Sequence, residues 1–236
     1  NPLVIFRQGA GHVQPNSALD PGLVYDSGWN DWLAFICATQ PQGLDATCNA
    51  LWTAGYSKDA SDFNSPSIAI GDLAGVQTVK RKLTNVSGGP LTVSAAVTGL
   101  AGFTPVVSPN TLVFAPGETK EFTVTFTRTT ATLNTYAGGQ LRWTGGDYTV
   151  RSPIVVRPVA IAVPAEVPVA GTSGSTSFPI KFGYTGAYTA GTHGLNEATT
   201  FDGTVSDDPT DTFVPGGPGT VFFDFDVPAG TAYTRF

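Results

Sequence analysis

The feature that most constrains the fold is a strict alternation of apolar and polar residues in the middle of the chain. Phe122, Val124 and Phe126 alternate with three threonines, which is the period of a strand with one buried face. Segments with a comparable alternation or a short apolar run lie at 91–97, 141–143 and 154–156. These patterns predict several short strands.

Turn-forming residues separate these predicted strands. The sequence holds 28 Gly and 18 Pro, and only 13% of its residues are charged. Turn signals occur at 87–90, 115–117 and 145–147, so the strands recur at a spacing of roughly ten residues. That spacing favours a β-sandwich over alternating strands and helices. We therefore expect a mainly β fold with a sandwich over residues 66–160.

The first segment, residues 1–65, has helical rather than strand-like spacing. Apolar residues at Trp29, Trp32, Leu33 and Ile36 predict a short helix, with Asp26 or Ser27 placed to cap it. A second short helix is predicted from the residues Leu44, Cys48, Leu51 and Trp52. Two helices of this length cannot hold a core of their own, so they must pack against another part of the protein.

The third segment, residues 161–236, begins after a proline-rich joint at 157–168. Residues 177–182 and 221–227 have strand-like patterns, 228–230 is a turn signal, and 232–236 begins a further strand. We expect an incomplete second β-sandwich or jelly-roll-like module. Its unpaired edge predicts a missing partner segment.

The two cysteines, Cys37 and Cys48, lie close together in the sequence. A disulfide is favoured over two free thiols, and it would stabilise the fold by about 3 kcal/mol on the chain-entropy account. A disulfide indicates an oxidising compartment, so we expect secretion. The chain contains no Met, and we expect it to be processed or to be a piece of a longer protein.

Charge and hydropathy exclude two classes of partner. The net charge is −6, and the only basic cluster is Lys80-Arg81-Lys82, which we expect on the solvent face of a strand. Nucleic acid would require a basic stripe, so we expect no nucleic-acid partner. No apolar stretch approaches the roughly 20 residues of a spanning helix, so we expect no membrane span.

Two further stretches carry a family resemblance. The run from Gly9 to Asp26, followed by Trp29 to Cys37, closely resembles the end of the catalytic domain in subtilisin-like serine proteases, the plant-type branch and its bacterial relatives above all. Residues 64–68, 78–86 and 141–154 resemble the fibronectin III-like domain that follows it, in the same order and spacing. Residues 161–236 resemble the C-terminal β-domain of bacterial subtilases less specifically. The residues of the structural family motif are Gly9, Gly11, His12, Asp20, Pro21, Gly22, Tyr25 and Asp26.

This resemblance implies a role in a larger enzyme. Residues 1–65 would complete the upstream protease domain, and the sandwich would support it. The Asp, His and Ser that hydrolyse peptide bonds in protein substrates would lie upstream of Asn1. The sequence indicates no particular oligomeric state.

A catalytic triad within this chain would need His12 or His193, the only histidines. Residues 191–194 and 170–174 are superficially similar to the family's catalytic His and Ser stretches. However, Ser173 precedes His193, whereas the family order is Asp, His, Ser, and no Met-Ala-like continuation follows Ser173. We therefore expect no catalytic residue here, and we interpret His12 as a structural loop residue.

Two polar features carry weaker hypotheses. Four aspartates in one loop could bind calcium, but they lack the regular spacing of a known calcium loop, so a solvated turn is favoured and no cofactor is expected. These aspartates are Asp202, Asp207, Asp208 and Asp211. Asn85-Val86-Ser87 is a glycosylation acceptor if the source is eukaryotic.

An alternative function is a binding or adhesion module in which the two β-domains recognise a polysaccharide or a protein partner. An exposed row of aromatic side chains would favour this alternative.

Overall fold

The computed structural model describes residues 4–40, 43–164, 167, 169, 174–191, 200–227 and 229–230. The chain divides into two compact units, residues 1–186 and 187–236.

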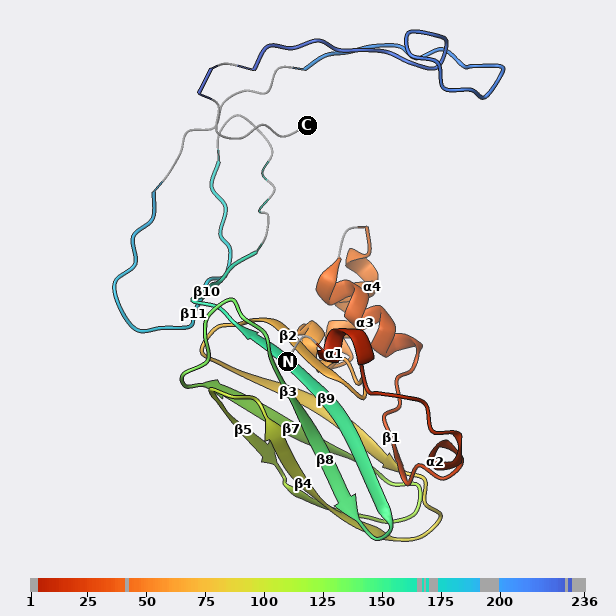
Figure 1. The fold of residues 1–236 in the computed structure, drawn as a ribbon, viewed down its shortest axis with the longest axis vertical. Helices are drawn as coiled ribbons and strands as arrows, with labels where there is room; N and C mark the ends of the chain where they lie inside the picture. Colours follow the sequence, from red (N-terminus) through yellow and green to blue (C-terminus); the bar gives the residue numbers. More distant parts are fainter. Residues whose placement is uncertain are drawn as a thin grey trace. The chain divides into compact units, whose positions relative to one another are not determined.

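The larger unit contains a β-sandwich made of two facing sheets (Figure 1). One sheet has the order β1-β3-β7-β5, and the other has the order β2-β9-β8-β4-β6. The strands of the first sheet are β1 (Leu23–Val24), β3 (Val76–Asn85), β7 (Thr119–Arg128) and β5 (Phe103–Ser108). The strands of the second are β2 (Ile68–Leu73), β9 (Tyr148–Pro158), β8 (Ala137–Gly145), β4 (Leu91–Gly99) and β6 (Thr111–Phe114). The predicted mainly β fold with a sandwich is confirmed.

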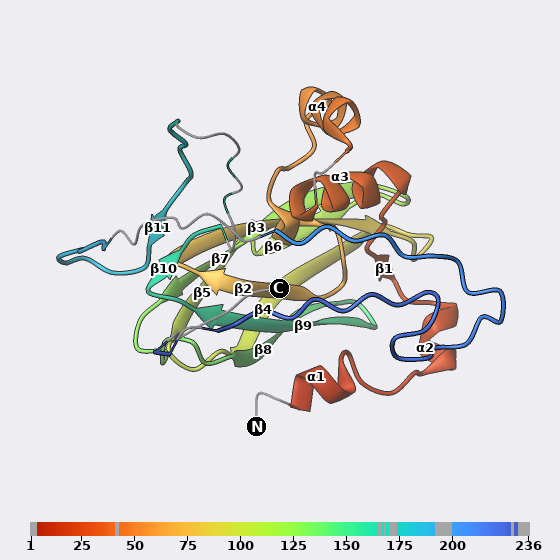
Figure 2. The ribbon, with the colours of Figure 1, turned by 90° about the horizontal axis from the view of Figure 1, so that it is seen from above.

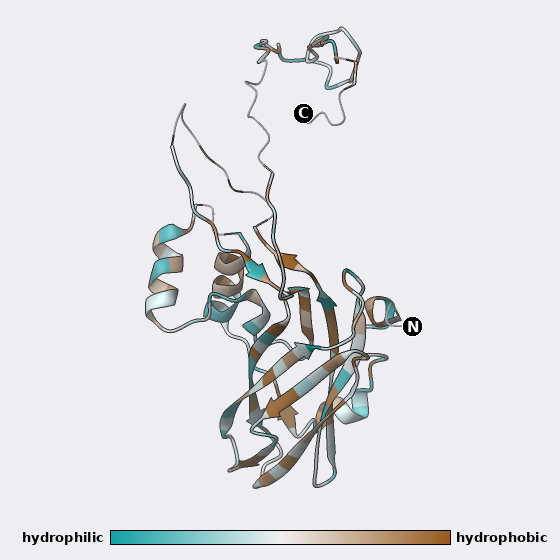
Figure 3. Ribbon diagram, turned by 90° about the vertical axis from the view of Figure 1, so that its left-hand side faces the viewer, coloured by the Kyte–Doolittle hydropathy of each residue, from teal (hydrophilic) through white to brown (hydrophobic). Residues whose placement is uncertain are grey.

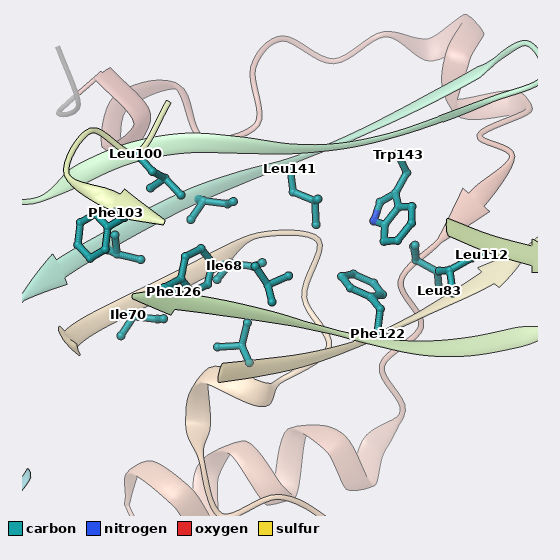
Figure 4. Packing of buried hydrophobic residues seen from close by; sticks show 14 of the residues in the cluster. Ile68, Ile70, Leu83, Leu100, Phe103, Leu112, Phe122, Phe126, Leu141 and Trp143 are labelled. Atoms are coloured by element: carbon teal, nitrogen blue, oxygen red, sulfur yellow. The ribbon is translucent and has the colours of Figure 1, made fainter. Parts of the chain in front are cut away.

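The core lies between the two sheets. The alternating Phe122, Val124 and Phe126 of β7 point into it, opposite Leu141 and Trp143 of β8 (Figure 4). The rings of Phe122 and Trp143 meet edge to face, with centroids 4.9 Å apart. Hydrophobic and hydrophilic residues alternate along the strands (Figure 3), because successive side chains of a strand point to opposite faces.

The sequence analysis placed the basic cluster on the solvent face of a strand, and for Arg81 this prediction is wrong. Lys80 and Lys82 are exposed, but Arg81 is only 3% exposed. Three consecutive residues of a strand cannot all face solvent, because the side-chain period is two. In β3 the inward positions are Val79, Arg81 and Leu83, so the middle residue of the basic run is buried.

Short helices precede the sandwich, and α3 and α4 lie on one side of it (Figure 2). Their bounds are α1 (Val4–Gln8), α2 (Pro15–Leu19), α3 (Trp29–Thr39), α4 (Asp45–Thr53) and the 3-10 helix η1 (Ala60–Asp62). Cys37 of α3 and Cys48 of α4 form a disulfide. Among the described residues, no helix is long and apolar enough to cross a membrane.

The predicted cap of α3 is wrong. The helix begins after Gly28, whose amide N–H donates to the Asp31 carboxylate at 2.8 Å. Ser27 does not cap the helix, because its hydroxyl donates to the carbonyl oxygen of Asn64 instead. The side chain three residues into the helix therefore supplies the cap interaction.

A second sandwich over 161–236 is not found among the described residues. Only β10 (Ile161–Ala162) pairs with β11 (Lys181–Phe182), and 221–227 is not a strand. The predicted strand at 232–236 lies outside the described residues. The alternation at 221–227 is real, but a strand also needs neighbouring strands to pair its backbone and to bury its apolar face.

Candidate functional site: the motif segment and the exposed helix face

The motif segment, residues 20–26, is built into the sandwich. Its strand β1 pairs antiparallel with the end of β3, Leu23 opposite Asn85 and Val24 opposite Thr84. Leu23 is buried in the sandwich core. The domain boundaries at 65/66 and 160/161 stay predictions. The motif segment nevertheless shares a sheet and a core with the sandwich.

Side-chain contacts join the motif segment to β9. The hydroxyl groups of Tyr25 and Ser152 are hydrogen-bonded at 2.7 Å, and the Tyr148 hydroxyl donates to the Asp20 carboxylate at 2.9 Å. Burial raises the pKa of Tyr25, while the hydrogen bond to Asp20 raises the pKa of Tyr148. Both phenols are therefore neutral at physiological pH, and Tyr148 donates its proton to Asp20.

Gly22 is required by this contact. Its φ is +70°, and a β-carbon at this position would lie 2.4 Å from the Tyr148 ring. Any other residue would be strained in the backbone and would collide with Tyr148. The glycine therefore allows the motif segment to approach β9 closely.

We expect Tyr25→Phe to lower the free energy of unfolding by about 1–2 kcal/mol, because it leaves the buried Ser152 hydroxyl without its partner. Since folding holds the Tyr25 proton more tightly, this contribution is complete below the unfolded pKa of about 10 and falls as pH rises further. Urea unfolding at neutral pH and at high pH measures both effects. Tyr148→Phe is the control, because its bond to Asp20 is exposed and should contribute less. Equal losses in the two variants would contradict this expectation.

The remaining motif residues lie at the surface. Gly9 and Gly11 have positive φ values of +51° and +108°. His12 is exposed and lines a shallow cavity with Arg142 and Arg151. The guanidinium of Arg151 donates to the carbonyl oxygen of Ala10. Pro21 is half-buried and Asp26 is exposed.

One face of α3 is apolar and uncovered by the rest of the described chain. Trp29 is 75% exposed, Trp32 49% and Ile36 39%. The other side of the helix packs on the chain itself. The ring of Phe35 lies 5.2 Å from that of Phe63, and the partly exposed Trp32 also contacts Phe63, with ring centroids 4.4 Å apart. A rigid helix that presents large apolar side chains to water is typical of an interaction surface.

Comparison with known proteins shows which proteins this chain is similar to. The family model described as a fibronectin type-III domain matches residues 62–156. Subtilisin-like protease SBT5.4 of Arabidopsis thaliana is 42% identical over 159 residues, which are 64% of this chain and 20% of that protein. Subtilisin-like protease SBT2.5 of the same plant is 38% identical over 153 residues, 64% of this chain and 19% of that protein. The chain matches the C-terminal region of subtilisin-like proteases.

The resemblance stated from the sequence is therefore confirmed. The chain spans about a fifth of the length of the curated relatives that it matches. Among solved structures, a FixG-related protein from Vibrio parahaemolyticus aligns at 17% identity with a TM-score of 0.31, over 35% of this chain and 78% of that chain. That likeness carries no functional argument.

Apart from His12, the residues weighed for catalysis and for calcium binding lie in the C-terminal part of the chain. Ser173 and His193 lie outside the described residues. The side chain of Asp208 accepts from the amide and hydroxyl of Thr210, and these bonds lower its pKa. In the described part of the chain, no three acidic, histidine or cysteine side chains converge to hold a metal ion. The calcium hypothesis for the aspartates at 202, 207, 208 and 211 stays a prediction.

Three phenylalanine side chains gather among the described residues of the smaller unit. Phe201 contacts Phe223 and Phe225, but the ring planes are inclined by 44° and 42°. The binding-module alternative stays a prediction.

Sequence reasoning missed the roles of Asn64 and Arg81. Both belong to stretches that carry the family resemblance, but their side chains are buried and bond to distant backbone groups. The only signal was a charged residue at an inward position of the β3 alternation.

Proposed function

We propose that this chain is the non-catalytic C-terminal region of a secreted subtilisin-like serine endopeptidase and that it stabilises the protease domain. The parent would hydrolyse peptide bonds in proteins with an Asp, a His and a Ser that lie outside this chain. The uncovered face of α3 is the observation that carries the proposal.

The occupant of that face follows from the relatives. Burying a large apolar side chain contributes about 1.5–3 kcal/mol relative to leaving it in water, so Trp29, Trp32 and Ile36 favour a covering partner. About four fifths of each matched protease lies outside the matched region, and these relatives are named as proteases. The protease domain is therefore the partner that we assign to this face.

The sandwich would give this face a fixed position. The motif segment is tied to β3 by strand pairing and to β9 by Tyr25 and Asp20. The Cys37–Cys48 disulfide joins α3 to α4, and it supports a site of action in an oxidising compartment. A protease domain that packs against α3 would therefore contact a helix whose position is fixed.

We expect a Trp29→Ser, Ile36→Ser double variant of the complete protease to lose activity faster on heating, with a Tm lower by several degrees. Trp32 is left unchanged, because it also packs on Phe63 within this chain. The kcat/KM of the surviving enzyme at low temperature should be unchanged, because these residues are not catalytic. Thermal inactivation and calorimetry of the whole protein measure these effects.

The matched control is a Val106→Ser, Val113→Ser double variant, which removes exposed apolar side chains from the outer faces of the sandwich. The control should inactivate at the wild-type rate. If the Trp29→Ser, Ile36→Ser variant also kept the wild-type rate, α3 would not be the docking face and the proposal would fail.

A further inference from the structure

The side chain of Arg81 in β3 is buried, with only 3% of the residue exposed. Its Nε donates to the carbonyl oxygen of Ser65 at 3.0 Å, and Nη2 donates to that of Ser67 at 3.0 Å. Its Nη1 donates to the carbonyl oxygens of Ser61 and Lys80, both at 2.7 Å. Three of the four acceptors lie in residues 59–67, which we call the linker.

The linker covers the free edge of β3 with side chains instead of a strand. The Asp62 carboxylate accepts from the amide N–H of Lys80 at 2.7 Å. The Asn64 side chain accepts from the amide of Lys82 at 2.7 Å and donates to the carbonyl oxygen of Lys82 at 3.1 Å. An open strand edge is a liability for pairing with other chains, so the linker also protects this edge.

The same linker holds the helices. Phe63 packs against Trp32 and Phe35 of α3. Asn64 donates from its side chain to the carbonyl oxygen of Asp26, and its own carbonyl oxygen accepts from the Ser27 hydroxyl. The path from helix to sandwich therefore runs through the linker, and Arg81 is the residue of β3 with the most side-chain bonds to it.

The charge of Arg81 makes its hydrogen bonds to the linker cooperative. The two ion pairs found in the described residues involve other side chains, so backbone carbonyls are the close partners of the guanidinium. Burial lowers the pKa of Arg81 to about 10, which still leaves it charged at neutral pH. A buried charge that loses its hydrogen bonds costs free energy. Detaching any part of the linker would leave the buried guanidinium with fewer acceptors, so partial detachment is unfavourable.

We propose that Arg81 is a conformational lock that couples the linker, and with it α3 and α4, to the sandwich. The lock does not depend on the protease-domain role of this chain. Loss of Arg81 frees the linker and the helices, while the two sheets stay folded.

The amides of Lys80 and Lys82 report on the lock directly, because they donate to linker side chains. By the alternation of an antiparallel strand, the amides of Arg81 and Leu83 point to β7 instead. In Arg81→Met, hydrogen exchange measured by NMR should quicken about tenfold or more at Lys80 and Lys82, since bonds to a charged group are lost. Exchange at Val124 and Phe126 in β7 should stay as in the wild type.

The matched control is Arg142→Met, because Arg142 is exposed and, among the described residues, its guanidinium donates to the Gln140 side chain and not to the linker. This variant should show wild-type exchange at all these amides. No change at Lys80 and Lys82 in a folded Arg81→Met protein would overturn the proposal. An equal increase across β7 would also overturn it, because Arg81 would then serve the sandwich as a whole.

Arg81→Lys gives a second test if Arg81→Met does not fold. Lysine keeps the charge and a flexible stem but lacks the planar fork that reaches several acceptors at once. Exchange at Lys80 and Lys82 should rise in this variant, by less than in Arg81→Met. Wild-type exchange would show that the fork does not hold the linker, and the lock would be rejected.

Discussion

Replacing Trp143 with Ala should lower the free energy of unfolding by about 3–5 kcal/mol, the largest loss we expect from one side chain. Trp143 is fully buried at the centre of the sandwich and packs edge to face on Phe122. Its removal leaves a cavity between the two sheets that neighbouring side chains of β7 and β8 can fill only in part. Denaturant unfolding followed by circular dichroism measures the loss.

Trp143→Phe separates packing from hydrogen bonding at this position. The indole Nε1 has no hydrogen-bond partner among the described residues, so phenylalanine removes an unsatisfied buried donor as well as some volume. We expect a loss of about 1–2 kcal/mol, because the smaller cavity and the lost donor act in opposite directions. A Phe variant as unstable as the Ala variant would show that the indole bonds to a group within the fold.

The position of Trp143 could be predicted from the sequence because strand alternation is a local signal. Leu141 and Trp143 share one face of β8, and Phe122, Val124 and Phe126 share one face of β7. Periodicity alone assigns each of these residues to the interior. The pairing of β8 with β9 also follows from a short turn, Gly145–Tyr148, between consecutive strands.

Long-range polar contacts could not be predicted in this way. Arg81 bonds to Ser61, Ser65 and Ser67, and these partners become near only when the linker crosses the edge of β3. A basic run indicates a solvent face when its burial is judged from charge alone. The alternation of β3, which places Val79 and Leu83 inward, was the better guide.

The C-terminal segment shows the opposite failure. Alternating residues at 221–227 satisfy the local rule for a strand, yet the described structure has no strand there. Local pattern specifies which face would be buried, but pairing partners decide whether a strand forms. The candidate helix face was likewise visible as spacing in the sequence, whereas its exposure needed the structure.

Asn85→Ala should lower the free energy of unfolding by about 3 kcal/mol, because it removes several buried hydrogen bonds at once. Asn85 is fully buried at the end of β3. Its side-chain amide donates to the carbonyl oxygens of Gly89 and Ala115, and its side-chain oxygen accepts from the amide and hydroxyl of Ser87. Alanine would remove the shared partner of the Gly89 and Ala115 carbonyl oxygens and of the Ser87 amide, and with it the contacts that join the end of β3 to these two turns.

The same contacts exclude a glycan at the Asn85-Val86-Ser87 acceptor site in the folded protein, because the side-chain nitrogen is already engaged with two carbonyls. Mass spectrometry of folded protein secreted from eukaryotic cells should therefore find Asn85 unmodified. Asn110→Ala is the control for stability, since Asn110 is exposed and should change the free energy of unfolding by less than about 0.5 kcal/mol. A glycan on Asn85, or equal stability of the Asn85 and Asn110 variants, would mean that Asn85 does not join the end of β3 to the two turns in solution.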